Sequence, residues 1–121
     1  MLEIKMLLTK EMPISFQNDC ARSSFGNHST QFTSMLTRGV SALIDDENDQ
    51  YNLIVSLKGF NSFTPDNDPY NEHDFFSFDF KNQKLFFKID YYDLNKEHGS
   101  EDPSDPGVTH RVMTVMCANE Y

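Results

Sequence analysis

The segment 64–74, T-P-D-N-D-P-Y-N-E-H-D, concentrates side chains that could bind a cation. Asp66 and Asp68 form a D-x-D pattern, and E-H-D follows at positions 72–74. Carboxylate and imidazole groups are ligands for hard or borderline cations. The segment lacks the glycine and the bidentate glutamate of an EF-hand, and it has no zinc-type His/Cys cluster. Its Pro and Asp residues equally favour tight turns, so a structural loop, a partner contact and a metal site are three interpretations of it.

His73 is flanked by two carboxylates, Glu72 and Asp74. A nearby carboxylate stabilises the imidazolium form, which suits a general acid or a pH-sensitive contact. Neighbouring residues of an extended segment point to opposite sides, so His73 could meet one of these carboxylates or neither. The sequence therefore assigns no catalytic residue, although the flanking pattern makes His73 a candidate for binding.

Two later segments combine turns, anions and aromatic rings. D-Y-Y-D at positions 90–93 would end a strand with Tyr91 in the core and Tyr92 at its rim, where a tyrosine supplies rigid contact area and one hydrogen bond. G-S-E-D-P-S-D-P at positions 99–106 has no nucleophile-elbow context for its serines, so no hydrolase is predicted. The residues that we expect to contact a partner are Asp66, Asp68, Glu72, His73, Asp74, Tyr92, Asp93, Glu101 and Asp102.

These motifs resemble a small bacterial family of unknown function, found mostly in proteobacteria and often on plasmids and integrated mobile elements. The resemblance is carried by F-T-P-D-N-D-P-Y-x-E-H-D-F, K-I-D-Y-Y-D, G-S-E-D-P-x-D-P and T-x-R-V-x-T-x-M-x-A-x-E-Y, with Q-N-D-x-x-R and T-R-G-V-x-A-L upstream. The family commonly has tryptophan where this chain has Phe87 and leucine where it has Gln17. The resemblance supplies no catalytic residue. The genomic setting of the family suggests an antidefence protein. Such a protein would inhibit host restriction or CRISPR systems by offering DNA-like carboxylate surfaces.

The charge of the chain is concentrated in one part of the sequence. Residues 61–106 contain eleven acidic residues and four lysines, a net charge of −7 out of −9 for all 121 residues. The absence of a Lys/Arg stripe argues against direct nucleic-acid binding, and the negative charge argues against an anionic membrane surface. A basic protein partner, multivalent cations or simple solubility are compatible with this charge.

The bulk features predict one soluble cytoplasmic domain with no cofactor. Cys20 and Cys117 lie far apart without a C-x-x-C spacing, so we expect two reduced thiols and leave a disulfide as the alternative. No signal peptide or transmembrane run is visible. Residues 1–121 fit a single domain, with positions 1–12 as a peripheral extension that could form a short strand or helical turn.

The periodicity of the chain predicts five elements. A helix is expected over 14–25, ending at Gly26, and a strand over 30–37. A second helix over 45–58 begins with acidic residues that favour a helix N-terminus, and Phe-rich alternation predicts a hairpin over 73–92. A last strand over 108–118 is apolar on both faces and hence central. The expected fold is α+β, a mostly antiparallel sheet of about four strands with two helices packed on one face.

Three functional hypotheses follow. The leading one is an acidic binding or inhibitor module whose loops 66–74 and 101–105 engage a basic protein surface, with antidefence as its sharpest form. The alternative is a metal-dependent enzyme acting on nucleic acid or nucleotides, with ligands drawn from Asp66, Asp68, His73 and Asp90. The third is assembly through a free sheet edge, which would give a homodimer.

Overall fold

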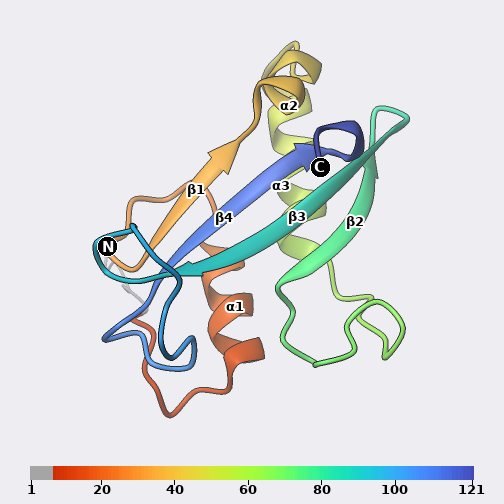
Figure 1. The fold of residues 1–121 in the computed structure, drawn as a ribbon. Helices are drawn as coiled ribbons and strands as arrows, with labels where there is room; N and C mark the ends of the chain where they lie inside the picture. The colour runs from red at the N-terminus through yellow and green to blue at the C-terminus, as the bar shows by residue number, and fades with distance from the viewer. Residues whose placement is uncertain (1–6) are drawn as a thin grey trace, which may run out of the picture.

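The computed structural model describes residues 7–121, which form four strands and several short helices (Figure 1). In chain order these are α1 (Ile14–Ser23), β1 (Phe32–Leu36), α2 (Arg38–Leu43), α3 (Glu47–Gly59), β2 (Phe75–Phe80), β3 (Gln83–Tyr92), β4 (His110–Cys117) and the 3-10 helix η1 (Ala118–Glu120). The strand or helical turn expected at positions 1–12 falls partly outside the described residues, and positions 7–12 form only a turn. None of the helices in the described part is long and apolar enough to cross a membrane.

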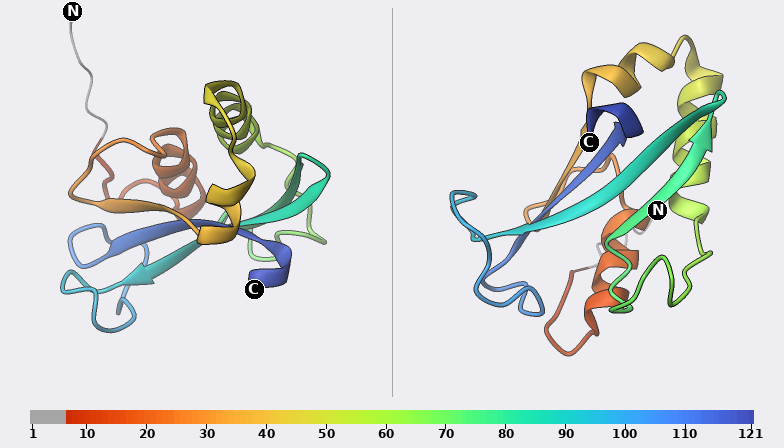
Figure 2. Two further views of the ribbon diagram at one scale, coloured as in Figure 1. Left: turned by 90° about the horizontal axis from the view of Figure 1, so that it is seen from above. Right: turned by 45° about the vertical axis from the view of Figure 1, so that its right-hand side comes forward.

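The four strands form one mixed sheet in the order β1-β4-β3-β2. The β2–β3 and β3–β4 pairs are antiparallel, whereas β1 pairs with β4 in parallel. Helices α1 and α3 lie on the same face of the sheet, as the view from above shows (Figure 2). The structure thus confirms the predicted α+β class, the four strands and the central position of the last strand, and it adds the parallel pairing of β1.

Local sequence signals explain where several elements begin and end. Asp46 caps α3, because its carboxylate accepts a hydrogen bond from the backbone N–H of Asp49 at 2.8 Å. Lys81 and Asn82 both have positive φ, 51° and 61°, which gives the two-residue turn that suits the twist of the β2–β3 hairpin. Gly26, at φ 89°, turns the chain after α1.

The core fills the space between the helices and the sheet with aromatic and aliphatic side chains. Phe76 lies at its centre, stacked on Phe60 with ring centroids 3.9 Å apart and on Phe87 at 5.0 Å. The other fully buried apolar residues are Ala21, Val40, Leu53, Leu57, Leu85, Met113 and Val115. Cys20 and Cys117 are both free, as the sequence predicts.

Candidate functional site

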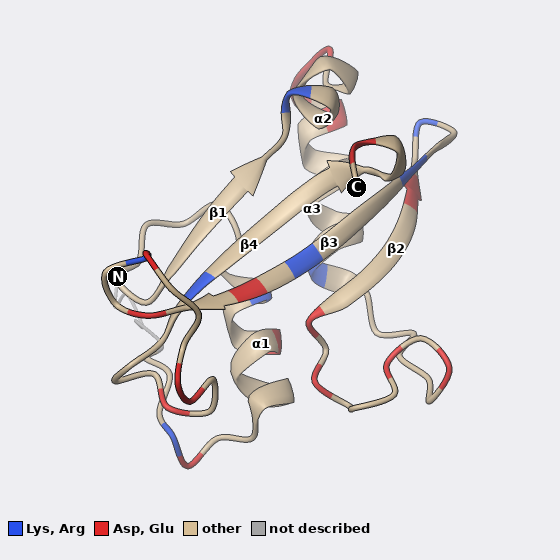
Figure 3. Ribbon diagram, in the orientation of Figure 1, with Lys and Arg blue, Asp and Glu red and all other residues tan. Residues whose placement is uncertain are grey.

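Two acidic loops lie at the same end of the sheet, with α1 between them (Figures 1 and 3). The loop 61–74 leads into β2, and the loop 93–109 follows β3, so the antiparallel pairing of these strands brings both loops to one end. The first loop has four carboxylates and no Lys or Arg, and the second has five carboxylates and one lysine. Together they account for −8 of the net charge of −9. We call this end of the molecule the acidic end.

Three consecutive residues of α1 hold the two loops. Gln17 Nε2 donates to the backbone oxygen of Ser104 in the second loop at 2.7 Å. Asn18 Nδ2 donates to the backbone oxygen of Glu72 in the first loop at 2.8 Å, and Asp19 contacts the ring of His73. Successive helix residues point in directions about 100° apart, so one turn of α1 reaches loops on both of its sides.

A buried polar network continues this link through the sheet. Arg111 Nε donates to Asn18 Oδ1 at 2.7 Å, and its NH2 group donates to the backbone oxygen of Pro103 at 2.9 Å. Asn18 also donates to the Tyr91 hydroxyl at 2.8 Å, which in turn donates to Asp74 at 3.0 Å. Asn18 and Arg111 have no exposed surface. The network therefore runs without interruption from one acidic loop to the other.

The ionisation of this network follows from its burial. Burial is the largest cause that raises the pKa of the Tyr91 hydroxyl far above its ordinary value of about 10, and the charge of Asp74 acts in the same direction. Burial also lowers the pKa of Arg111 below its ordinary value, while Tyr91 acts against this. Tyr91 is consequently a neutral donor to Asp74 at all moderate pH values.

The raised pKa of Tyr91 predicts a loss of stability in alkali. Below about pH 10 the phenol is protonated in both the folded and the unfolded chain, so its contribution to stability is fully present. Above about pH 10 the unfolded chain loses the proton first, and the free energy of unfolding should fall as pH rises. Urea unfolding between pH 8 and 11.5 measures this slope, and Tyr91→Phe should flatten it. An equal slope in Tyr91→Phe would show that other groups cause it.

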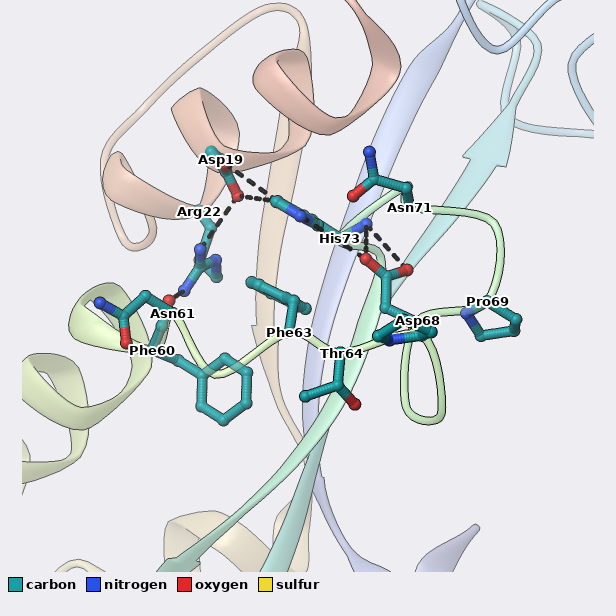
Figure 4. Close-up of a pocket in the computed structure, with 11 residues that line it drawn as sticks. Asp19, Arg22, Phe60, Asn61, Phe63, Thr64, Asp68, Pro69, Asn71 and His73 are labelled. Carbon is teal, nitrogen blue, oxygen red and sulfur yellow. Dashed lines mark hydrogen bonds and ion pairs between the residues drawn. The ribbon is translucent and has the colours of Figure 1, made fainter.

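The first acidic loop also forms one wall of a cleft of about 400 Å³, which we call the His73 cleft (Figure 4). His73 Nδ1 lies 3.0 Å from Asp19, and its Nε2 lies 3.5 Å from Asp68. The imidazole stacks on Phe63 with ring centroids 3.9 Å apart and planes within 5°. A neutral imidazole has one N–H group, so only the imidazolium form can donate to both carboxylates.

Two charged side chains of the His73 cleft make several hydrogen bonds within the protein itself. The Arg22 guanidinium donates to the backbone oxygens of Leu57 and Phe60 and to Asp19. The Asp68 carboxylate accepts hydrogen bonds from the backbone N–H groups of Glu72 and His73. Neither serine nor cysteine lines this cleft among the described residues. The arrangement therefore fastens the loop to α1.

The structure brings four of the predicted contact residues together and separates the others. Asp68, Glu72, His73 and Asp74 lie beside α1, where burial, followed by the charge of Asp74, raises the pKa of Glu72. Asp66, in the same loop, is exposed. The remaining predicted residues, Tyr92, Asp93, Glu101 and Asp102, belong to the end of β3 and the second loop.

Several predicted carboxylates shape the loops. The side chain of Asp93 accepts a hydrogen bond from the backbone N–H of Glu97 at 3.0 Å, which is the largest cause that lowers the pKa of Asp93. Asp102 accepts one from the backbone N–H of Ser104 at 3.1 Å. Such bonds are the turn chemistry that Asp favours. These residues therefore stabilise the loop, and any contact they make with a partner is additional.

Sequence reasoning missed the residues of α1 as part of the site. Asp19 and Arg22, three positions apart in Q-N-D-x-x-R, form an ion pair at 3.1 Å and line the His73 cleft. Phe63, at the start of the acidic motif, also lines this cleft and stacks on His73. The sequence signal for these residues is the polar cluster Q-N-D-x-x-R on the predicted helix 14–25, which otherwise has apolar residues along one side.

The metal-enzyme alternative loses its geometric support. It required at least three of Asp66, Asp68, His73 and Asp90 to meet. Asp90 lies on β3 and pairs with Lys88 at 2.8 Å, and Asp66 is exposed in the loop. Across residues 7–121, no group of three or more His, Cys, Asp or Glu side chains is placed to hold a metal ion.

Comparisons with known proteins agree with the resemblance seen in the motifs. The match to a family model begins at Leu36, so Q-N-D-x-x-R lies outside the matched residues, whereas both acidic loops lie within them. Neither the curated proteins nor the solved structures contain a match to the chain. The family match spans residues 36–120, and the chain therefore belongs to the family described as protein of unknown function DUF3768.

Proposed function

We propose that this protein is a binding module that presents its acidic end to a basic surface of a protein partner. The proposal rests on one observation: Gln17 and Asn18 of α1 form hydrogen bonds to the backbone of both acidic loops. Because the loops are fastened before any partner arrives, less conformational entropy is lost on binding than with disordered acidic segments. The summed field of the loops would also attract a basic partner and raise its association rate.

Seven of the nine carboxylates of the acidic end fall into two groups. Asp68, Asp74, Asp93 and Asp102 accept hydrogen bonds within the loops or from Tyr91. In contrast, the exposed side chains of Asp66, Glu97 and Glu101 make no hydrogen bond or ion pair within residues 7–121. Carboxylates of this second kind can meet Lys or Arg of a partner without any loss to the fold. Asp66 and Glu101, one in each loop, are the preferred contacts.

The antidefence form of this proposal takes the partner to be a host enzyme that binds DNA. Such enzymes have basic clefts that neutralise phosphates, and a rigid array of carboxylates could occupy such a cleft. This form rests on the charge of the acidic end together with the association of the family with mobile elements. It requires that the captured partner loses DNA binding when this protein is added.

The test is a charge reversal with a matched control. Asp66→Lys/Glu101→Lys changes the net charge of the acidic end by +4, and Glu47→Lys/Asp79→Lys makes the same change on exposed residues of α3 and β2. Affinity capture from host extract should recover a basic protein with the unchanged chain and with the control. The acidic-end variant should bind that protein at least ~10-fold more weakly, with a reduced salt dependence.

Titration of the purified partner by calorimetry at two salt concentrations measures both effects. Equal affinity of the two double variants would show that total charge, and not the acidic end, governs binding. Capture only of proteins without a basic surface would contradict the proposal in another way. Urea unfolding of each variant separates lost binding from lost folding.

A further inference from the structure

A groove next to β1 is lined by no carboxylate. It has a volume of about 670 Å³ and lies where the loop between α1 and β1 meets the first part of the second acidic loop (Figure 1). Its ten lining residues include two histidines, one lysine and five hydroxyl or amide side chains, but no Asp or Glu. The His73 cleft contains Asp19 and Asp68, and a third cleft contains Asp93 and Glu101. In a chain with 19 acidic residues, this absence distinguishes the groove.

Lys96 supplies positive charge to this groove. It is the one lysine of the loop 93–109 and has acidic neighbours, Asp93 and Glu97, yet it forms no ion pair within the described part of the chain. Its backbone has φ 61°, a left-handed conformation that is uncommon for lysine. The side chain instead lines the groove with His110. Lys96 therefore contributes a positive charge at the groove that pairs with no carboxylate among residues 7–121.

His110 is 5% exposed and lines the groove. Burial is the main cause that lowers its pKa, and the positive charge of Lys96 adds to this effect. Its Nε2 lies 2.8 Å from the Thr33 hydroxyl. The imidazole also forms a hydrogen bond with the backbone of Thr30, and this bond raises the pKa of His110. Both contacts hold the ring in one orientation beside Lys96.

Two serine hydroxyls complete the set of donors. Ser29 Oγ accepts a hydrogen bond from the backbone N–H of Gln31 at 3.1 Å, and Ser34 Oγ accepts one from Gly26 at 2.9 Å. A hydroxyl whose oxygen accepts such a bond still has its own proton to donate. Neither proton has an acceptor within residues 7–121. The groove thus presents an ammonium and two hydroxyl donors, with no anion to compete for them.

We propose that this groove binds the phosphate group of a small phosphorylated ligand. A phosphate offers several acceptor oxygens and a negative charge, which match an ammonium flanked by hydroxyl donors. The groove is larger than one phosphate and has the volume typical of small-molecule sites, so it also accommodates the organic part of such a ligand. The groove adjoins the second acidic loop through Lys96 but is lined by none of the carboxylates of the acidic end, and its test does not depend on the protein partner.

Thermal unfolding with defined probes tests this proposal. Inorganic phosphate and AMP are compared with adenosine and with sodium chloride at matched ionic strength. A ligand at a hundred times its dissociation constant should raise the melting temperature by several degrees. Phosphate and AMP should both do so, whereas adenosine should not. Acetate is added to the series because a carboxylate could use the same donors.

The key control removes the charge without straining the backbone. Lys96→Asn suits the left-handed conformation, because Asn tolerates positive φ, and it should abolish the shift. Lys84→Asn, at an exposed lysine of β3, should keep it. Phosphate stabilises many proteins because it is excluded from their surface. If phosphate raised the melting temperature of Lys96→Asn as much as that of the unchanged protein, this exclusion would explain the shift and the proposal would be overturned. No shift with either phosphate probe, or a larger one with acetate, would also overturn it.

NMR titration of the full chain gives a second measurement that is independent of stability. Amide signals of residues 26–34 and the ring signals of His110 should move with phosphate in the unchanged protein. The signals of the His73 cleft should stay in place. Movement confined to the loop 61–74 would contradict the assignment of the groove.

Discussion

Replacement of Arg111 by alanine should lower the free energy of unfolding by about 3–5 kcal/mol. The guanidinium is completely buried and donates to Asn18 and to the backbone of Pro103 at 2.7 and 2.9 Å. Truncation leaves the buried Asn18 oxygen and the partly buried Pro103 oxygen without this donor. It also opens a cavity beside Tyr91, whose ring centroid lies 5.2 Å from the guanidinium. Domains of this size are stable by only about 5–15 kcal/mol, so the loss is a large fraction of the total.

Urea unfolding measures this effect, with Arg38→Ala as the control at an exposed arginine of α2. The control should change stability by no more than about 0.5 kcal/mol. Arg111→Met retains most of the volume and should still cost about 2 kcal/mol, since the same two acceptors lose their donor. If Arg111→Met were as stable as the unchanged protein, the relief from burying a charge would offset the lost hydrogen bonds. The network would then contribute nothing to stability.

The second large effect is expected at Phe76, the centre of the aromatic core. Phe76→Ala should destabilise the fold by about 3–5 kcal/mol, because a fully buried ring is lost and its neighbours cannot all collapse into the space. Phe60 and Phe87 stack on this ring, and Phe63 meets it edge-on at 5.8 Å. Because Phe63 also stacks on His73, the variant should loosen the first acidic loop as well as the core.

Chemical denaturation and hydrogen exchange test both parts of this expectation. Phe16→Ala on α1 is the matched control, since that ring is 49% exposed. The control should lose less than about 1 kcal/mol and leave exchange in the loop 61–74 unchanged. Faster exchange of loop amides in Phe76→Ala alone would support the link from core to loop. Equal losses in the two variants would contradict the central role of Phe76.

The elements with strong periodicity were predictable from sequence, and those defined by long-range pairing were not. The hairpin follows from the alternation of Phe76, Phe78 and Phe80, and α3 follows from its acidic start at Asp46. Helix α2 was missed because it is six residues long and contains Gly39, so no amphipathic pattern develops. The parallel pairing of β1 with β4 has no local signature, because alternation marks a strand but not the direction of its neighbour.

The candidate site was predictable in its acidic half only. The residue types of the motif that contains Asp68 and His73 indicate a binding site without any structure. Its counterpart on α1 could not be identified, because nothing in the sequence shows that Asp19 reaches His73. Nor could the roles of the carboxylates be separated, since the turn-forming Asp102 and the uncommitted Glu101 are adjacent in the chain. Which carboxylates form hydrogen bonds within the loop depends on the backbone conformation. The positive φ of His73 is an example of a conformation that the sequence does not reveal.

The strand order also has a consequence for the order in which the protein can fold during synthesis. The β2–β3 hairpin can form as soon as it leaves the ribosome, but β1 has β4 as its one neighbour in the described sheet, and Phe32 pairs with Arg111. Closing so long a loop costs entropy before any contact compensates for it, which slows folding. Until β4 emerges, β1 and the inner edge of β3 are both unpaired strand edges, which invite chaperone binding or aggregation. The nascent chain is thus most vulnerable to aggregation between the synthesis of Tyr92 and that of Cys117. The second acidic loop is made in this interval, and its negative charge can repel other copies of the unfinished sheet.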